Sequence, residues 1–438
     1  MPRVPAALAR ARFPAPLLDV LRRLAAADHP SWVVGGAVRD LLLHRKRDAT
    51  DFDVATPATP EEVTALFPRV IPTGVAHGTV TVLAGDERIE VTTFRGEGAY
   101  VDGRRPESVT FHRDLEADLA RRDFTMNAMA YDPLGHAFAD PSGGLADIRR
   151  RRIRAVGDPA ARFGEDGLRP LRAVRFAAQL GYALDPRTRA AIPDALEVVR
   201  KVSVERVAEE LSRLVVAPHA GPALALLSRS GLLAVAVPEL AALPRATLAH
   251  AGAVLQATPA EPPLRFAALL HPLGAQAAER VLLGLRLPRR LAEEAAALIG
   301  AHACRALRPA PVDPATPAEV RRLLAAVGRE RIGAVLALAT AEARALPPGR
   351  RARAAAAGAR RLAERVRAVL AEAPPLSTPE LALDGRAVMA LLGAGPGPHV
   401  GEALRHLLDQ VLADPAENTP ERLGQALQRW WELRPGRL

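Results

Sequence analysis

The hydrophobic period of the chain changes near residue 150, and this change constrains the fold more than any other feature. Before that point, strand-like runs such as residues 78–83 and 89–94 alternate with short helical patterns and glycine turns. Mixed patterns of this kind are typical of an α/β domain. Beyond it the period is helical almost throughout, and Ala, Leu, Arg and Glu replace aromatic and β-branched residues. We therefore expect an α/β head followed by an all-helical remainder.

Breaks rich in proline and small residues interrupt the helical part at residues 305–317, 346–351 and 373–379. Such breaks end helices and divide them into groups. We predict four consecutive modules: an α/β head at 1–150, a helical neck at 151–215, a helical body at 216–303 and a helical tail at 304–438.

The charge balance favours a polyanionic partner. The formal net charge is +10 and the isoelectric point is near 10.8, which makes nucleic acid plausible. However, lysine occurs only at positions 46 and 201, and the chain is rich in alanine, proline and arginine. The excess of arginine therefore also fits a compositional bias of the coding sequence. Charge alone does not establish the partner.

The single cysteine, Cys304, excludes an internal disulfide framework and a cysteine-rich zinc site. No segment approaches the roughly 20 uninterrupted apolar residues that a membrane span requires. We therefore expect a cytoplasmic protein with no membrane partner.

A glycine pair joins a strand-like run to a helical one at residues 31–43. Gly35 and Gly36 carry no side chains, so a phosphate could approach the backbone N–H groups where the helix begins. Arg39, one turn further, could add a charged contact. A glycine pair is also a common structural turn, so this signal depends on its context.

The context is a pair of aspartates, Asp51 and Asp53, that would share one face of a strand while Phe52 points to the other. Adjacent carboxylates repel unless a cation lies between them, and their oxygens suit Mg²⁺ that carries a polyphosphate. Asp-x-Asp is also frequent on surfaces. Following the glycine turn and helix, it indicates a metal-dependent nucleotidyltransferase. Glu90 would be a third carboxylate if its strand neighbours Asp51 and Asp53, and otherwise an ordinary outward strand acid.

Six motifs, found in order between residues 31 and 210, carry a resemblance to a known family. They are GGAVRD at 35–40, DFD at 51–53, RRDFTMNA at 121–128, IRAVGD at 153–158, EDGLR at 165–169 and VSVER at 202–206. Together they resemble the class II tRNA nucleotidyltransferases, the CCA-adding enzymes, and the related bacterial poly(A) polymerases. The resemblance implies a head with a polymerase-β-like mixed sheet and helices, then helical neck, body and tail modules.

The resemblance also implies roles for individual residues. Gly35, Gly36 and Arg39 would contact the triphosphate, and Asp51 and Asp53 would hold Mg²⁺. The remaining nucleotide-binding positions would be Arg122, Asp123, Asn127, Asp166, Arg169, Arg172 and Arg175. The substrates would be CTP, ATP and the 3′ end of tRNA, with the helical modules contacting the acceptor arm and elbow.

Asp166 and Arg169 offer a physical basis for choosing C and A. Both bases present an exocyclic amino donor beside a ring-nitrogen acceptor, whereas U and G reverse this order. A carboxylate accepts and a guanidinium donates, so the pair matches C or A. Arg172 and Arg175 continue the same row, which would direct them toward the phosphates or the incoming RNA end.

The product is less well determined than the family. Residues 96–107 resemble a flexible loop that CCA-adding and A-adding members need, and Ala128 stands where poly(A) polymerases tend to carry serine. We therefore expect CCA addition, with A-adding, CC-adding and poly(A) synthesis as alternatives. An alternative from a different functional class is a non-catalytic RNA-binding protein with the same fold.

Two histidines receive structural interpretations. His77 lies in a glycine-flanked turn and is expected to organise the backbone. His271 is followed by Pro272 rather than by the aspartate that marks a phosphohydrolase module in some members. We therefore expect His271 to end a helix, and no phosphohydrolase activity.

Overall fold

The computed structural model describes residues 3–45, 52–75, 78–96, 112–302 and 316–433. The chain divides into two compact units, Met1–Ala242 and Leu243–Leu438. Asp51, His77, Cys304 and most of the predicted loop at 96–107 lie outside the described residues.

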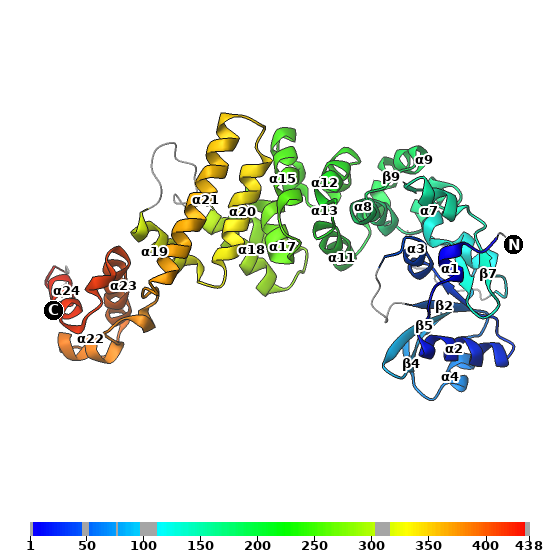
Figure 1. The fold of residues 1–438 in the computed structure, drawn as a ribbon, viewed down its shortest axis with the longest axis horizontal. Coiled ribbons are helices and arrows are strands. Elements are labelled where there is room, and N and C mark those ends of the chain that lie inside the picture. The colour runs from blue at the N-terminus through cyan, green and yellow to red at the C-terminus, as the bar shows by residue number, and fades with distance from the viewer. Residues whose placement is uncertain (1–2, 46–51, 76–77, 97–111, 303–315, 434–438) are drawn as a thin grey trace. The chain divides into compact units, whose positions relative to one another are not determined.

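The first unit contains a seven-stranded mixed sheet in the order β3-β4-β5-β2-β1-β6-β7. The strands are β1 (Trp32–Val34), β2 (Asp53–Thr56), β3 (Val70–Gly74), β4 (Thr79–Ala84), β5 (Glu87–Thr93), β6 (Ala130–Asp132) and β7 (Ala137–Ala139). β2 and β5 run parallel, while the other neighbouring pairs are antiparallel. The predicted α/β head is thereby confirmed (Figure 1).

One face of this sheet is covered by α2 (Ala15–Ala26) and α4 (Pro60–Leu66), which contact β4 and β5 (Figure 1). Ile89 and Val91 of β5 are buried, whereas Glu90 between them is exposed. This alternation follows from the two-residue period of a strand. The covered face builds the core, and the opposite face of β5 is left for function.

Helices dominate the first unit beyond the sheet. They are α1 (Ala6–Ala9), α3 (Gly36–Leu42), α5 (Leu115–Ala120), η2 (Thr125–Asn127), α6 (Gly144–Arg149), α7 (Pro159–Glu165), α8 (Leu168–Leu180), α9 (Pro186–Ala190), η3 (Pro193–Ala195), α10 (Leu196–Arg200), α11 (Val204–Val215), α12 (Ala220–Arg229), α13 (Leu232–Ala236) and α14 (Pro238–Ala241). A short parallel pair, β8 (Arg152–Ile153) and β9 (Ala183–Leu184), lies among them.

Helix α8 carries the predicted row of arginines. Its buried residues Leu171, Val174 and Ala178 recur at helical spacing, and it packs against α11 and α12. The helix ends where Gly181 adopts a left-handed conformation, with φ of 67°. Burial of this apolar stripe positions the arginine-bearing side of α8.

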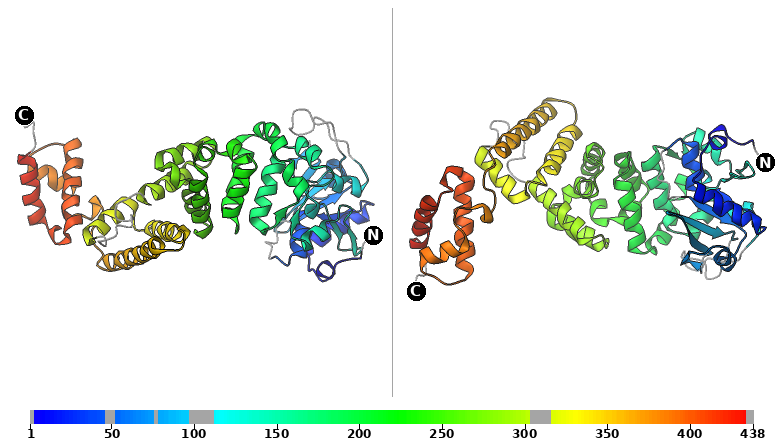
Figure 2. Two further views of the ribbon diagram at one scale, coloured as in Figure 1. Left: turned by 90° about the horizontal axis from the view of Figure 1, so that it is seen from above. Right: turned by 60° about the horizontal axis from the view of Figure 1, so that its bottom comes forward.

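The second unit is helical throughout its described residues (Figure 2). Its elements are α15 (Arg245–Ala257), α16 (Pro262–Leu270), η4 (His271–Leu273), α17 (Ala275–Gly284), α18 (Arg289–His302), α19 (Pro317–Val327), α20 (Ile332–Ala345), α21 (Arg350–Ala371), η6 (Thr378–Glu380), α22 (Gly385–Leu392), α23 (Pro398–Ala413), η7 (Pro415–Glu417) and α24 (Pro420–Glu432). Among the described residues, no helix has the length and apolar character of a membrane span. The helical remainder predicted beyond residue 150 is confirmed, except that β8 and β9 of the first unit form a short two-stranded sheet within it.

Candidate active site

A cleft of about 560 Å³ in the first unit brings the predicted site residues together. Its walls come from the turn between β1 and α3, from β2 and β5, from the segment around η2 and from α8. The predicted residues that line it are Gly35, Gly36, Arg39, Asp53, Glu90, Arg122, Asp123, Asn127, Asp166, Arg169, Arg172 and Arg175. Residues separated by up to 140 positions in sequence therefore share one concave surface.

The glycine turn forms the strand-to-helix connection that the sequence indicates. Gly35 has φ of 70°, a conformation that residues with a Cβ rarely adopt. A Cβ at this position would lie 3.0 Å from Nη1 of Arg122. The positive φ therefore favours glycine at position 35, and an added Cβ would also make the end of the Arg122 side chain shift.

Asp53 and Glu90 lie directly beside each other, because β2 and β5 pair in parallel with these two residues in register. Neighbouring strands are about 4.8 Å apart, so two in-register side chains on one face come close together. Both residues are exposed, and Phe52 is buried on the other side. Glu90 thus neighbours Asp53 as a third carboxylate would, while Asp51 lies outside the described residues, and the role of Glu90 as a metal ligand stays a prediction.

A chain of hydrogen bonds joins four residues across the cleft. Arg39 Nη1 donates to Asn127 Oδ1 at 2.6 Å, and Asn127 Nδ2 donates to Asp123 Oδ1 at 3.1 Å. Arg172 Nε then donates to Asp123 Oδ2 at 2.8 Å. The network connects α3 to α8 through the η2 segment, so it holds the glycine turn and the arginine row in a fixed relation.

Asp123 is the central acid of this network. Burial opposes its ionisation, but the charge of Arg172 and the hydrogen bonds from Asn127 and Arg172 outweigh burial and lower the pKa of Asp123 to about 2. Its side chain also accepts a hydrogen bond from the backbone N–H of Phe124 at 2.7 Å. Asp123 is therefore ionised at neutral pH.

Each arginine of the row on α8 pairs with an acid from a different place. Arg169 hydrogen-bonds Glu165, and its Nη2 donates to the carbonyl of Arg121 at 3.2 Å. Arg172 pairs with Asp123, and Arg175 with Glu210 of α11. The arginines are thus oriented by ion pairs before any ligand is bound.

Asp166, the predicted base-reading acid, is oriented by two contacts. Its Oδ1 accepts from the N–H of Leu168 at 3.0 Å, and its Oδ2 accepts from Arg206 Nη2 at 2.9 Å. Arg206 belongs to α11, so the packing of α11 on α8 also positions this carboxylate. Asp166 and Arg169 line the same cleft but are held by separate partners.

Sequence reasoning missed several side chains that organise the cleft. The ring of Phe176 lies beneath three guanidinium groups, with centroid distances of 5.2 Å to Arg39, 5.4 Å to Arg172 and 4.0 Å to Arg175. Such cation–π contacts favour closely gathered cations. Arg206 and Glu210 lie at i and i+4 on one helix, a spacing that places them on the same face, but their partners, Asp166 before α8 and Arg175 on α8, could not be inferred from the sequence.

Asp118 is a further residue that the sequence analysis missed. It is fully buried and pairs with both Arg121 and Arg122 at 2.5 Å and 3.0 Å. Burial raises its pKa, but the two arginine charges outweigh burial, so the pKa of Asp118 is lowered overall. A buried acid therefore orients the arginine that approaches Gly35.

Comparisons with known proteins show the family of the chain. Residues 31–154 match the family described as "Poly A polymerase head domain", and residues 181–243 match "Probable RNA and SrmB- binding site of polymerase A". The CCA-adding enzyme of Geobacillus stearothermophilus is 40% identical over 406 residues, which cover 93% of this chain and 94% of that protein. The chain belongs to the CCA-adding enzyme family. The resemblance inferred from the motifs is confirmed.

The structural relatives of this CCA-adding family member agree as well. The crystal structure of the Bacillus stearothermophilus CCA-adding enzyme in complex with CTP matches with a TM-score of 0.77 at 36% identity, covering 96% of this chain and 98% of that chain. A CCA-adding enzyme structure with ATP matches with a TM-score of 0.68 at 19% identity, which shows the shared fold.

Proposed function

We propose that this protein adds C and A nucleotides to the 3′ end of tRNA in the cytoplasm, without a nucleic-acid template, using CTP and ATP and releasing pyrophosphate. One observation carries the proposal. A single cleft combines a glycine turn, the adjacent carboxylates Asp53 and Glu90, and the oriented pair Asp166 and Arg169. The reaction is in-line attack of the terminal 3′-hydroxyl on the α-phosphorus.

Asp53 and Glu90, with Asp51 from outside the described residues, are the proposed Mg²⁺ ligands. Their fit to a hard cation is supported by chemistry, since neighbouring carboxylate oxygens are what Mg²⁺ prefers, and the register of β2 and β5 puts two of them side by side. Bound Mg²⁺ would polarise the phosphoryl oxygens and neutralise the charge of the leaving pyrophosphate.

The triphosphate is assigned to the glycine turn and the arginines around it. Gly35 and Gly36 leave the backbone accessible. The guanidinium of Arg122 lies close to the turn, with Nη1 at 3.0 Å from where a Cβ at position 35 would stand. Arg39 and Arg172, held at Asn127 and Asp123, contribute positive potential to the same wall. Charge on this wall binds the phosphates without requiring large side-chain movement.

The base is assigned to Asp166 and Arg169. Each Asp166 oxygen accepts one protein hydrogen bond and retains a further lone pair for an exocyclic amino group. Arg169 donates from a guanidinium that Glu165 and the Arg121 carbonyl orient. C and A match this arrangement, whereas U and G bring a carbonyl toward the carboxylate, at a cost of about 1–3 kcal/mol for each unmatched buried group.

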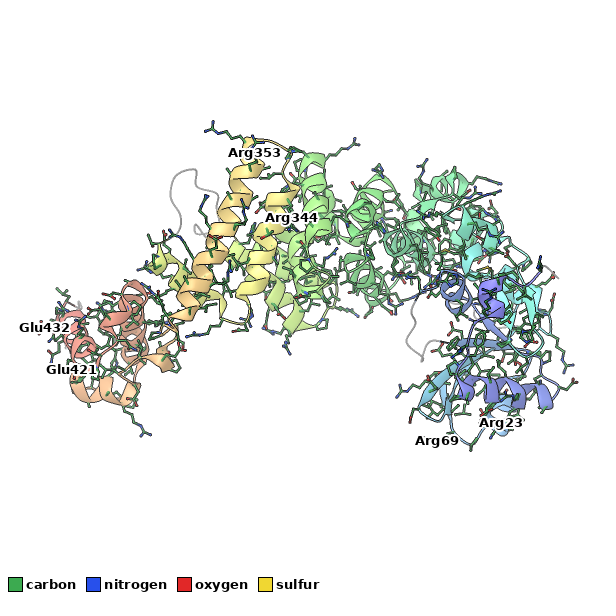
Figure 3. All side chains as sticks on the ribbon, viewed as in Figure 1. Arg23, Arg69, Arg344, Arg353, Glu421 and Glu432 are labelled. Atoms are coloured by element: carbon green, nitrogen blue, oxygen red, sulfur yellow. The ribbon has the colours of Figure 1, made fainter. Side chains whose placement is uncertain are left out.

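The tRNA acceptor arm and elbow are assigned to the helical modules. Support comes from the net charge of +10 and from exposed arginines on long helices, such as Arg353 on α21, whose side chain points outward in Figure 3. Contacts to phosphates make such binding strongly salt-dependent. Double-stranded RNA is recognised mainly by shape and backbone, which suits a surface of this kind.

The test is a primer-extension assay. Purified protein is incubated with Mg²⁺, labelled CTP or ATP, and tRNA that lacks its last three nucleotides. We expect extension by three nucleotides when both substrates are present. Absence of extension with any nucleotide would reject the enzymatic proposal and favour a non-catalytic RNA-binding protein.

Product length in the same assay distinguishes the related activities. Extension by two nucleotides with CTP alone, and no further, indicates CC addition. Extension only of tRNA that already ends in CC indicates A addition. A long ladder with ATP alone indicates poly(A) synthesis.

A further inference from the structure

Three potential metal ligands meet in the second unit, which does not contain the catalytic cleft. They are His250 on α15, His271 at the start of η4 and Glu342 on α20, and all three are half-buried. One ligand atom from each lies within 4.8 Å of the others. Atoms that share one Zn²⁺ at about 2.0–2.2 Å are about 3.5 Å apart, so small side-chain rotations would close the site.

The tautomer of His271 suits a ligand. Its Nδ1 lies 2.9 Å from the backbone carbonyl of Ala268, and only a protonated Nδ1 can hydrogen-bond a carbonyl. The neutral ring then carries its lone pair on Nε2. Metal-binding histidines typically show this pattern, in which a backbone acceptor fixes the tautomer and the ring orientation.

A fourth residue holds the carboxylate. His302, the last residue of α18, pairs with Oε2 of Glu342, while Oε1 lies 3.8 Å from Nε2 of His250. The second ring nitrogen of His302 is buried and has no hydrogen-bond partner among the described residues. The rings of His250 and His302 stand 5.8 Å and 6.1 Å from that of His271. Histidines from three helical segments thus surround the carboxylate that α20 carries.

A purely structural ion-pair cluster explains this arrangement less well. Three imidazoles surround one carboxylate, which is more nitrogen donors than a single ion pair uses. Two imidazoles and a carboxylate are a donor set for a borderline-soft metal rather than for Mg²⁺.

We propose that His250, His271 and Glu342 bind a divalent transition-metal ion of the Zn²⁺ class, with His302 as the residue that positions Glu342. Sequence alone suggested only a helix-ending role for His271, because Pro272 follows it. Two histidines and a carboxylate leave a coordination position open for water. The ion would join α15, α20 and the turn after α16, and so stabilise the second unit.

The test uses tag-free, full-length protein that has been stripped with a chelator and titrated with Co²⁺, a spectroscopic substitute for Zn²⁺. We expect about one equivalent to give visible absorption bands of imidazole-bound Co²⁺ that Zn²⁺ displaces. Because the catalytic carboxylates offer only oxygen, the bands should persist in Asp53→Asn. Bands that disappear in that variant would overturn the proposal.

Matched variants identify the ligands. Glu342→Gln keeps the shape of the side chain and removes its charge. This variant and His250→Asn, each as a single substitution, should abolish the Co²⁺ absorption bands. His302→Gln should weaken Co²⁺ binding about 10–100-fold without abolishing it. His406→Asn, on α23, should bind as wild type. Unchanged binding by Glu342→Gln, or equal loss in His406→Asn, would refute the site.

Folding is checked separately. Far-UV circular dichroism must show that each variant keeps its helical content, and Zn²⁺ should raise the Tm of the wild type but not of Glu342→Gln. An equal rise in both proteins would show that Zn²⁺ binds elsewhere, and the proposal would be wrong.

Discussion

Replacing Asp123 by asparagine tests whether charge holds the catalytic cleft together. Asparagine preserves the shape of the side chain, but it presents a neutral amide to Arg172. In the structure, Arg172 reaches Asp123 at 2.7 Å and Glu210 only at 3.7 Å. The substitution would therefore leave a half-buried guanidinium with Glu210 as its remaining acidic partner at 3.7 Å.

The size of the effect follows from the pKa of Asp123. A shift from 3.8 to about 2 corresponds to about 2 to 3 kcal/mol of folding free energy at neutral pH. Because the folded-state pKa is the lower one, this stabilisation is fully present above pH 3.8 and is lost as the pH falls toward 2. Roughly half should remain at pH 3. The exposed fraction of Asp123 is 9%, so solvent screening is small.

Urea unfolding followed by Trp32 fluorescence measures this loss. The chain has three tryptophans, and changing Trp430 and Trp431 to phenylalanine leaves a single indole in the unit that holds Asp123. Asp158→Asn is the matched control, because this exposed acid caps α7 through Ala161 N–H and asparagine caps equally well. The electrostatic account would be refuted if Asp123→Asn and Asp158→Asn lowered the free energy of unfolding equally at pH 7. It would also be refuted if the loss caused by Asp123→Asn were as large at pH 3 as at pH 7.

Three further predictions concern the cleft. Asp53→Asn should abolish nucleotide incorporation while filter binding of tRNA persists, and retained turnover would show that the carboxylates do not hold the metal. Arg169→Ala should relax discrimination against UTP by about 1–3 kcal/mol in kcat/KM ratios, and unchanged selectivity would contradict base reading by this side chain. Gly35→Ala should lower the free energy of unfolding by about 1–2 kcal/mol because position 35 has a positive φ. Gly36→Ala should be tolerated, because the nearest atom to an added Cβ is Nη2 of Arg39 at 3.5 Å. Equal Tm values for the two variants would argue against strain at Gly35.

The parts of the fold that depend on local periodicity were predictable. Alternation in β5 and helical spacing in α8 are written in neighbouring residues, so element type and the inner face of each follow from sequence. The turn at Gly35 was predictable for the same reason. The division into four modules stays a prediction, and the two compact units meet at residues 242 and 243.

Pairing between distant elements was not predictable. Glu90 could have faced any neighbour, and only the parallel register of β2 and β5 brings it to Asp53. The partners of the arginine row were equally hidden, since Arg172 meets Asp123 across 49 positions and Arg175 meets Glu210 across 35. Such pairs arise from packing of whole elements, which a single sequence does not encode locally.

The parallel pairing of β2 with β5 also has a consequence for folding kinetics. Asp53 and Glu90 are separated by 37 positions, whereas the antiparallel pair β4 and β5 is joined by a turn at residues 85 and 86. Closing the longer loop costs more entropy, and non-local pairing slows folding. We therefore expect the β4–β5 hairpin to form early and the two carboxylates to meet only when the sheet closes, so a partly folded head would have no capacity to bind a nucleotide-bound cation.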